Sequence, residues 1–145
     1  MMHSFSIELL SDQSPASVFE AVRNIGQWWC GQYGEDISGN WEKPGDEFVF
    51  KAGDGAHYSR QKMVECIPPE RIVWEIVESK LSYLDQPDEW NGSALLFEIE
   101  AQDGKTRLRF THRGLMPTLA CYDSCSTAWN KYWKNSLAPL LNASI

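Results

Sequence analysis

The feature that most constrains the fold is a change of hydrophobic period near the C-terminus. Between Ser93 and His112 apolar side chains recur at every second residue on both sides of a turn at 102–105, which predicts two antiparallel strands. Beyond Pro117 the spacing becomes three and four residues. The positions on this new spacing are Leu119, Tyr122, Cys125, Trp129, Trp133 and Leu137. They predict an amphipathic helix of about 20 residues, roughly 30 Å long, which Pro139 ends or kinks near its last turn.

Shorter patterns predict the elements that precede this helix. Residues 4–10 alternate as a first strand, and Ser14-Pro15 is typical of the cap and first turn of a helix. The buried stripe of that helix is expected from Val18, Phe19 and Val22 to Ile25, followed by a short helix or turn at Trp28-Trp29. Strands are then expected weakly within 33–47 and more clearly around 48–51, 57–67, 71–79, 93–101 and 106–112, with hairpin turns at 53–55 and 102–105 and a loop at 81–90.

This order of elements indicates an α+β fold. A first strand, short helices, a run of five or six strands and one long helix place the helices on one face of an antiparallel sheet. Because a long meander twists and curls, its concave face requires a cover, and the C-terminal helix can supply it. We therefore expect residues 1–145 to form one domain in which a curved sheet wraps the last helix.

Charge and apolar patterning exclude several classes of partner. The net charge is −7 and the chain has no basic stretch, which argues against nucleic acid and anionic membranes. We find neither a signal peptide nor a run of about 20 apolar residues, so we expect no membrane insertion and a cytoplasmic location. Cys30, Cys66, Cys121 and Cys125 form no C-x-x-C pair, and two thiols at 121 and 125 do not complete a zinc site. We expect reduced, mostly buried cysteines, no metal and no cofactor.

Several segments in this order resemble the START-like (SRPBCC, helix-grip) superfamily. They are 14–21 and Trp28-Trp29, then 45–48, 65–74 and, as the strongest, 104–115. Within the superfamily the chain is similar to the branch of homologues of the activator of the heat-shock protein 90 ATPase. The resemblance implies a deep apolar cavity between the sheet and the last helix, used by family members for lipids, polyketides and other hydrophobic ligands. It also implies that true ATPase activators carry a further N-terminal domain, for which a chain beginning at the first strand has no room.

The high aromatic content, 12% of the residues, allows two interpretations. The rings either fill the core or line a ligand cavity with a few polar groups. The expected ligand-binding residues are Trp29, Phe48, Phe50, Tyr58, Trp74, Phe97, Phe110, His112, Cys121, Cys125 and Trp129. We favour non-enzymatic binding of a small hydrophobic molecule, and we assign no catalytic residue.

Two alternatives stay open from the sequence. One is a cyclase-, aromatase- or hydrolase-like enzyme with His112 or Tyr58 as acid or base, which requires an ionisable partner and open space beside the group. The other is a protein-interaction module like the chaperone activator. A homodimer is a further option, for which aromatic residues such as Trp41 and Trp90 are expected to be exposed.

Overall fold

The computed structural model describes residues 4–29, 34–53, 56–81, 90–114, 122–141 and 143–144. The strands are β1 (Ser4–Ser11), β2 (Asp36–Gly39), β3 (Glu47–Ala52), β4 (His57–Ile67), β5 (Arg71–Leu81), β6 (Ala94–Gln102), β7 (Lys105–Arg113) and β8 (Ala143–Ser144). The helices are α1 (Pro15–Arg23), α2 (Ile25–Trp28), α3 (Tyr122–Tyr132), a π-helical segment η1 (Trp133–Leu137) and α4 (Ala138–Leu140).

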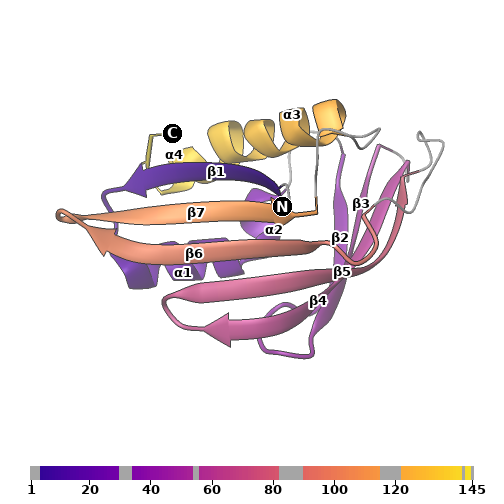
Figure 1. The fold of residues 1–145 in the computed structure, drawn as a ribbon, viewed down its shortest axis with the longest axis horizontal. Coiled ribbons are helices and arrows are strands. Elements are labelled where there is room, and N and C mark those ends of the chain that lie inside the picture. Colours follow the sequence, from indigo (N-terminus) through magenta and orange to yellow (C-terminus); the bar gives the residue numbers. More distant parts are fainter. Residues whose placement is uncertain are drawn as a thin grey trace.

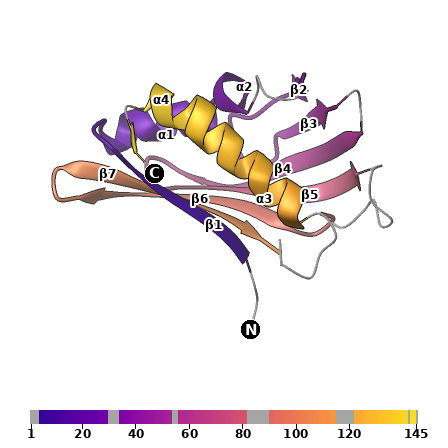
Figure 2. The same cartoon turned by 90° about the horizontal axis from the view of Figure 1, so that it is seen from above.

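The described strands form one antiparallel sheet in the order β2-β3-β4-β5-β6-β7-β1-β8. Strands β2 to β7 are a simple meander, and β1 returns to the far edge of β7. Figures 1 and 2 show the sheet curling around α3, with α1 and α2 on the same side. The α+β architecture predicted from the periods of the sequence, a curved antiparallel sheet around the C-terminal helix, is confirmed.

The first helix begins as its capping residues predict. The Oγ atom of Ser14 accepts a hydrogen bond from the backbone N–H of Ser17, and Pro15 occupies the first turn. The buried face carries Val18, Phe19 and Val22, as predicted. The chain then enters α2, where the indole of Trp28 donates to the carbonyl oxygen of Val22 at 3.0 Å. This bond places Trp29, the residue after α2, over the concave face of the sheet.

The C-terminal helix changes geometry before Pro139. In η1 the backbone N–H of Ala138 bonds to the carbonyl of Trp133, five residues earlier, which is one turn of π-helix. Because proline has no N–H and its ring displaces the preceding turn, this wide turn accommodates Pro139 inside α4 rather than at a sharp break. Leu119, which we expected on the same helical face, lies outside the described residues.

Tryptophan dominates the core. Trp28, Trp29, Trp74, Trp129 and Trp133 are fully buried on the inner face of the sheet. Trp90 is only 3% exposed, and Trp41 packs its ring against Phe48. The expectation that Trp41 and Trp90 are exposed is therefore wrong, because both rings turn toward the core. None of the helices in the described ranges is long and apolar enough to cross a membrane.

Candidate functional site

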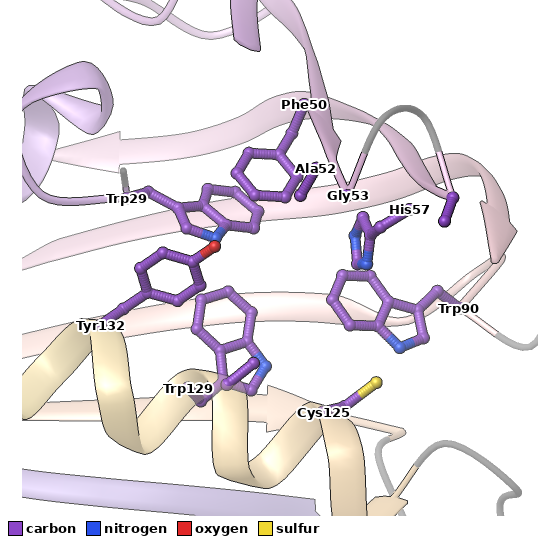
Figure 3. A pocket seen from close by; sticks show the side chains of 11 residues that line it. Trp29, Phe50, Ala52, Gly53, His57, Trp90, Cys125, Trp129 and Tyr132 are labelled. Carbon is purple, nitrogen blue, oxygen red and sulfur yellow. The ribbon is translucent and has the colours of Figure 1, made fainter. Parts of the chain in front are cut away.

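A cavity of about 280 Å³ lies between α3 and the end of the sheet formed by β3 and β4. Its lining consists of Trp29, Phe50, Ala52, Gly53, Ala56, His57, Trp90, Cys125, Ala128, Trp129 and Tyr132. Figure 3 shows Trp29, Phe50 and Tyr132 on one side of this space, His57 and Trp90 on the other, and Trp129 between them. Because Gly53 is exposed and Ala56 partly exposed, the cavity opens to the surface where β3 ends.

Helical spacing explains the wall that α3 contributes. Cys125, Ala128, Trp129 and Tyr132 follow one another at intervals of three, one and three residues, so they share one face of the helix. Cys125 and Trp129 belong to the stripe that the sequence predicts to be apolar, whereas Ala128 and Tyr132 were not part of that prediction. Ala128 is smaller than the other three residues on this face, and its short side chain leaves room for the cavity.

Two pairs of nearly parallel aromatic rings line the cavity. Trp29 stacks on Phe50 with ring centroids 4.0 Å apart and an interplanar angle of 16°. Trp90 lies parallel to Trp129, at 6.1 Å and 9°. The two pairs meet at Trp29 and Trp129, whose ring centroids are 5.0 Å apart. Such aromatic surfaces are apolar and stiff, and they favour flat apolar ligands.

His112 holds two of these walls in place through a chain of hydrogen bonds. The Nε1–H group of Trp129 donates to Nδ1 of His112 at 3.1 Å. Since Nδ1 is the acceptor, the ring proton is on Nε2, which donates to Oγ of Ser93 at 3.0 Å. Ser93 in turn donates to the carbonyl oxygen of Trp90 at 2.6 Å. This series of hydrogen bonds therefore links the indole of Trp129 to the backbone of Trp90, and both residues line the cavity.

The surroundings of His112 keep its ring neutral. The side chain is fully buried, and this burial, with a smaller contribution from nearby His57, lowers its pKa to about 3. Protonation at Nδ1 would also set two N–H donors against each other at Trp129. With both ring nitrogens occupied by Ser93 and Trp129, His112 is a positioning residue behind the cavity wall.

Two polar atoms in the cavity lining have no hydrogen-bond partner within the described part of the chain. They are Nε2 of His57 and Nε1 of Trp90, and both atoms are buried. Their rings meet edge to face with centroids 4.7 Å apart. Burial lowers the pKa of His57 to about 4, so its imidazole is neutral near pH 7. Buried polar groups normally find partners, so these two atoms mark the polar part of an otherwise apolar site.

With this geometry in place, the sequence relationship can be assigned. Residues 12–142 match the profile of the family described as Activator of Hsp90 ATPase homolog 1-like protein. The chain belongs to this family. No curated protein sequence matches it significantly.

Solved structures show the same helix-grip fold over nearly the whole chain. The Aha1 dimer of Colwellia psychrerythraea is 22% identical, with a TM-score of 0.74 and coverage of 97% of each chain. An Hsp90 activator from Plasmodium falciparum is 18% identical, with a TM-score of 0.65 and coverage of 99% of each chain. An uncharacterised Rhizobium leguminosarum protein is 20% identical, with a TM-score of 0.71 and coverage of 98% of this chain and 95% of that one. At these identities the similarity establishes the fold.

The structure brings together part of the set of residues expected to bind ligand. Trp29, Phe50, Cys125 and Trp129 line the cavity. Phe48, Trp74, Phe97 and Phe110 face the same interior but pack in the core beside it. His112 lies behind Trp129, and Cys121 lies outside the described residues. A role in ligand binding stays a prediction for all of them.

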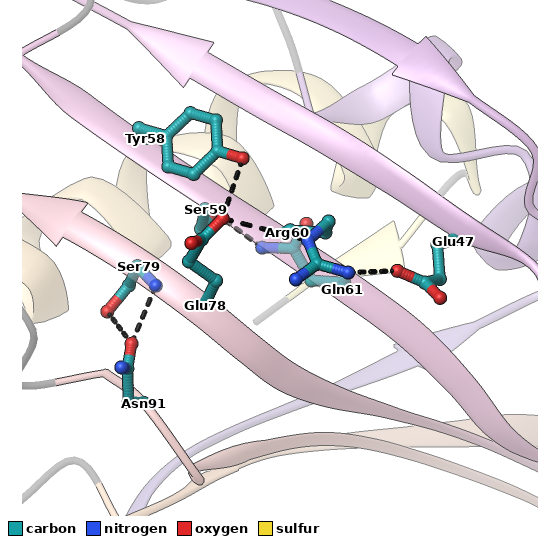
Figure 4. A network of polar contacts seen from close by, with 8 residues as sticks. All are labelled: Glu47, Tyr58, Ser59, Arg60, Gln61, Glu78, Ser79 and Asn91. Carbon is teal, nitrogen blue, oxygen red and sulfur yellow. Dashed lines mark hydrogen bonds and ion pairs between the residues drawn. The ribbon is translucent and has the colours of Figure 1, made fainter.

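Tyr58 lies on the face of the sheet opposite to the one expected. It pairs with Lys51 and Lys80 across the neighbouring strands, and its hydroxyl donates to Glu78 at 3.0 Å. Figure 4 shows it in a polar network with Arg60 and Glu78, away from the helices. The inward position belongs to His57, because a shift of one residue along a strand exchanges the two faces.

Polar residues on the inner face of β4 hid this register from the sequence. Ser59 and Gln61 are both fully buried, and the Gln61 amide donates to Ser59 at 2.5 Å. Since the inward positions are not apolar, the alternation that identified other strands is absent here. Trp90 was not among the expected ligand-binding residues either, because it follows an acidic segment for which a solvated loop was favoured.

The described residues include no cluster of three or more His, Cys, Asp or Glu side chains that could hold a metal ion. Cys125 is buried and Cys66 is partly buried, and neither is in a disulfide. Burial raises the pKa of Cys66, which keeps its thiol protonated. Cys30 and Cys121 are outside the described part of the chain, so the paired role of Cys121 and Cys125 stays a prediction.

Proposed function

We propose that this protein binds a small hydrophobic molecule, without catalysis, in the cavity between α3 and the ends of β3 and β4. The observation that carries the proposal is the cavity itself. A core so rich in large rings nevertheless leaves about 280 Å³ unfilled, next to fully buried Trp29. Protein interiors are otherwise close-packed, and a space of this size near the surface is close to the lower limit of typical ligand pockets.

The geometry favours binding over acid–base chemistry. A general acid or base must reach its substrate and needs a tuned partner. Both ring nitrogens of His112 are occupied by a hydroxyl and an indole, and its ring is behind the cavity wall. Tyr58 is on the outer face of the sheet. The two groups considered for an enzyme are therefore poorly placed for one.

Native mass spectrometry of gently purified protein tests the proposal directly. We expect a fraction of the protein to carry a small molecule of low polarity. In Ala128→Phe, the new ring enters the cavity from α3 and takes up space that the ligand needs. Because burial of the ligand supplies the affinity, the bound fraction is expected to fall about tenfold or more. Thr127→Phe is the matched control, because Thr127 is the exposed neighbour on the same helix.

Equal ligand occupancy in Ala128→Phe and Thr127→Phe would contradict this site. Absence of any bound molecule in the wild-type protein, together with failure of small aromatic probes to bind, would contradict the proposed function as a whole.

A second candidate is an interaction module in a chaperone system. It is favoured by the family, and by the structural similarity to proteins described as Aha1 and as an Hsp90 activator. The Colwellia protein is a dimer, so a homodimer is a corresponding proposal for this chain, with light scattering as its test. We also propose a cytoplasmic location, in keeping with either function.

A further inference from the structure

The shape, volume and polar atoms of the cavity indicate which kind of hydrophobic molecule fits it. Its walls carry several planar rings, among which Trp29 stacks on Phe50 and Trp90 lies parallel to Trp129. Flat rings offer π-faces and edges that complement another ring better than a branched aliphatic chain. The shape therefore favours an aromatic ligand.

The volume limits the ligand to a small ring system. A cavity of about 150 Å³ lined by apolar side chains holds benzene, and this cavity is about 280 Å³. Scaling by volume suggests a molecule of roughly eleven non-hydrogen atoms, which corresponds to two fused rings with one substituent. A long lipid chain would have to extend out of the opening at Gly53.

The polar atoms require one hydrogen-bonding group on that molecule. Nε2 of His57 and Nε1 of Trp90 are buried without a partner among the described residues, and leaving a buried polar atom unpaired is costly. The neutral His57 ring can offer Nε2 as donor or acceptor, depending on its tautomer, whereas Trp90 can only donate. A hydroxyl group both donates and accepts, so it suits either form of His57.

The lining offers no charged side chain to pair with an ionised ligand. No Asp, Glu, Lys or Arg is among the lining residues that the structure describes. His57 is neutral because of burial, and the chain as a whole carries −7. An anion would find no counter-charge, and burying an unpaired ion is costly.

We propose that the cavity takes an uncharged aromatic molecule of one or two fused rings that carries a hydroxyl group, and that this hydroxyl pairs with Nε2 of His57. The inference rests on the proposed function and specifies the ligand class of the same site. His57 is thereby the residue that distinguishes a hydroxylated ring from a plain hydrocarbon of the same shape.

Titration with β-naphthol and naphthalene tests this assignment, because the two probes differ only in the hydroxyl. Dissociation constants can be followed on the tryptophan indole N–H signals in NMR spectra. In His57→Leu we expect β-naphthol to bind about tenfold more weakly, the loss of one buried hydrogen bond. Naphthalene binding is expected to change by less than about threefold, since leucine keeps the wall apolar.

Two further variants control for general damage. His57→Gln keeps a hydrogen-bonding end and is expected to retain most of the preference for β-naphthol. Tyr58→Phe removes a hydroxyl from the next residue of the same strand, but on the outer face. It is expected to leave the affinity for both probes unchanged.

The possible results separate this inference from the proposed function. If both probes bind and His57→Leu weakens them equally, the pairing with His57 is overturned while the binding cavity stands. If neither probe binds to the wild-type protein, both proposals fail. A larger loss for β-naphthol than for naphthalene in His57→Leu, with recovery in His57→Gln, supports the pairing.

Discussion

Lowering the pH from about 7 to about 4.5 is expected to destabilise the folded protein through His57 and His112. Burial lowers the pKa of His57 to about 4, and that of His112 to about 3, from an ordinary value of 6.5. The unfolded chain therefore takes up protons at these side chains before the folded protein does. Stability is complete at neutral pH and is lost as the pH falls below about 6.5 toward the two folded-state values.

The size of this loss follows from the displaced pKa values. Each pKa unit corresponds to about 1.36 kcal/mol. By pH 4.5 both histidines are still largely neutral in the folded state, so each contributes a loss of about 2.5 kcal/mol relative to pH 7. The pKa of His57 is displaced less than that of His112, which makes its share the smaller one. A total of about 4–5 kcal/mol is comparable to the whole stability of a small domain.

Urea unfolding followed by tryptophan fluorescence measures this effect at half-unit steps of pH. The comparison is between the wild-type protein, His57→Leu and His112→Gln, neither of which can titrate at the substituted position. Each variant is expected to lose about 2 kcal/mol less than the wild type between pH 7 and pH 4.5, whatever its stability at pH 7. Equal pH dependence in the three proteins would refute the argument that burial keeps these imidazoles neutral.

Two further predictions concern the frame of the fold. Gly39 has φ of 125°, and a Cβ atom there would lie 2.4 Å from a carbonyl oxygen of β3, so Gly39→Ala is expected to lower the free energy of unfolding by at least about 3 kcal/mol. Gly45→Ala, with φ of 95° but open space, should cost only about 1 kcal/mol, and equal costs in urea unfolding would contradict the steric reason. Ser11 donates to the carbonyl of Leu141 at 2.6 Å in a buried position, so Ser11→Ala should cost about 1–3 kcal/mol. Ser6 is exposed on the same strand, so Ser6→Ala should lower the free energy of unfolding by less than about 0.5 kcal/mol. A similarly small value for Ser11→Ala would show that the hydrogen bond from Ser11 to Leu141 does not stabilise the fold.

Much of the fold was accessible from periodicity because most elements bury one face only. The strand around Leu108 alternates strictly between buried and less buried residues, and the apolar stripe of the last helix repeats at three and four residues. The cap at Ser14 fixed the start of α1. These signals are local, since each depends on side chains close in sequence.

The cavity was less accessible, because its lining comes from β3, β4, α3 and residues outside these elements such as Trp29 and Trp90. The stripe on α3 identified Cys125 and Trp129 as wall residues, and Phe50 followed from its strand. His57 was missed because its neighbours on the inner face of β4 are polar, so the pattern there favoured Tyr58. Trp90 was missed because no local pattern shows that a ring after an acidic segment folds back into the core.

The sequence by itself determined the periods, and hence an antiparallel sheet with a long helix to cover it. The same repeat that predicts the helix also marks its inner face, on which Cys125 and Trp129 lie. Only the tertiary structure decided whether the rings on that face would fill the interior completely or leave a cavity. That outcome depends on how Trp29, Trp90 and Trp129 meet across long sequence separations. A cavity between side chains from distant elements produces no local pattern in the sequence, because it depends on how those side chains pack together.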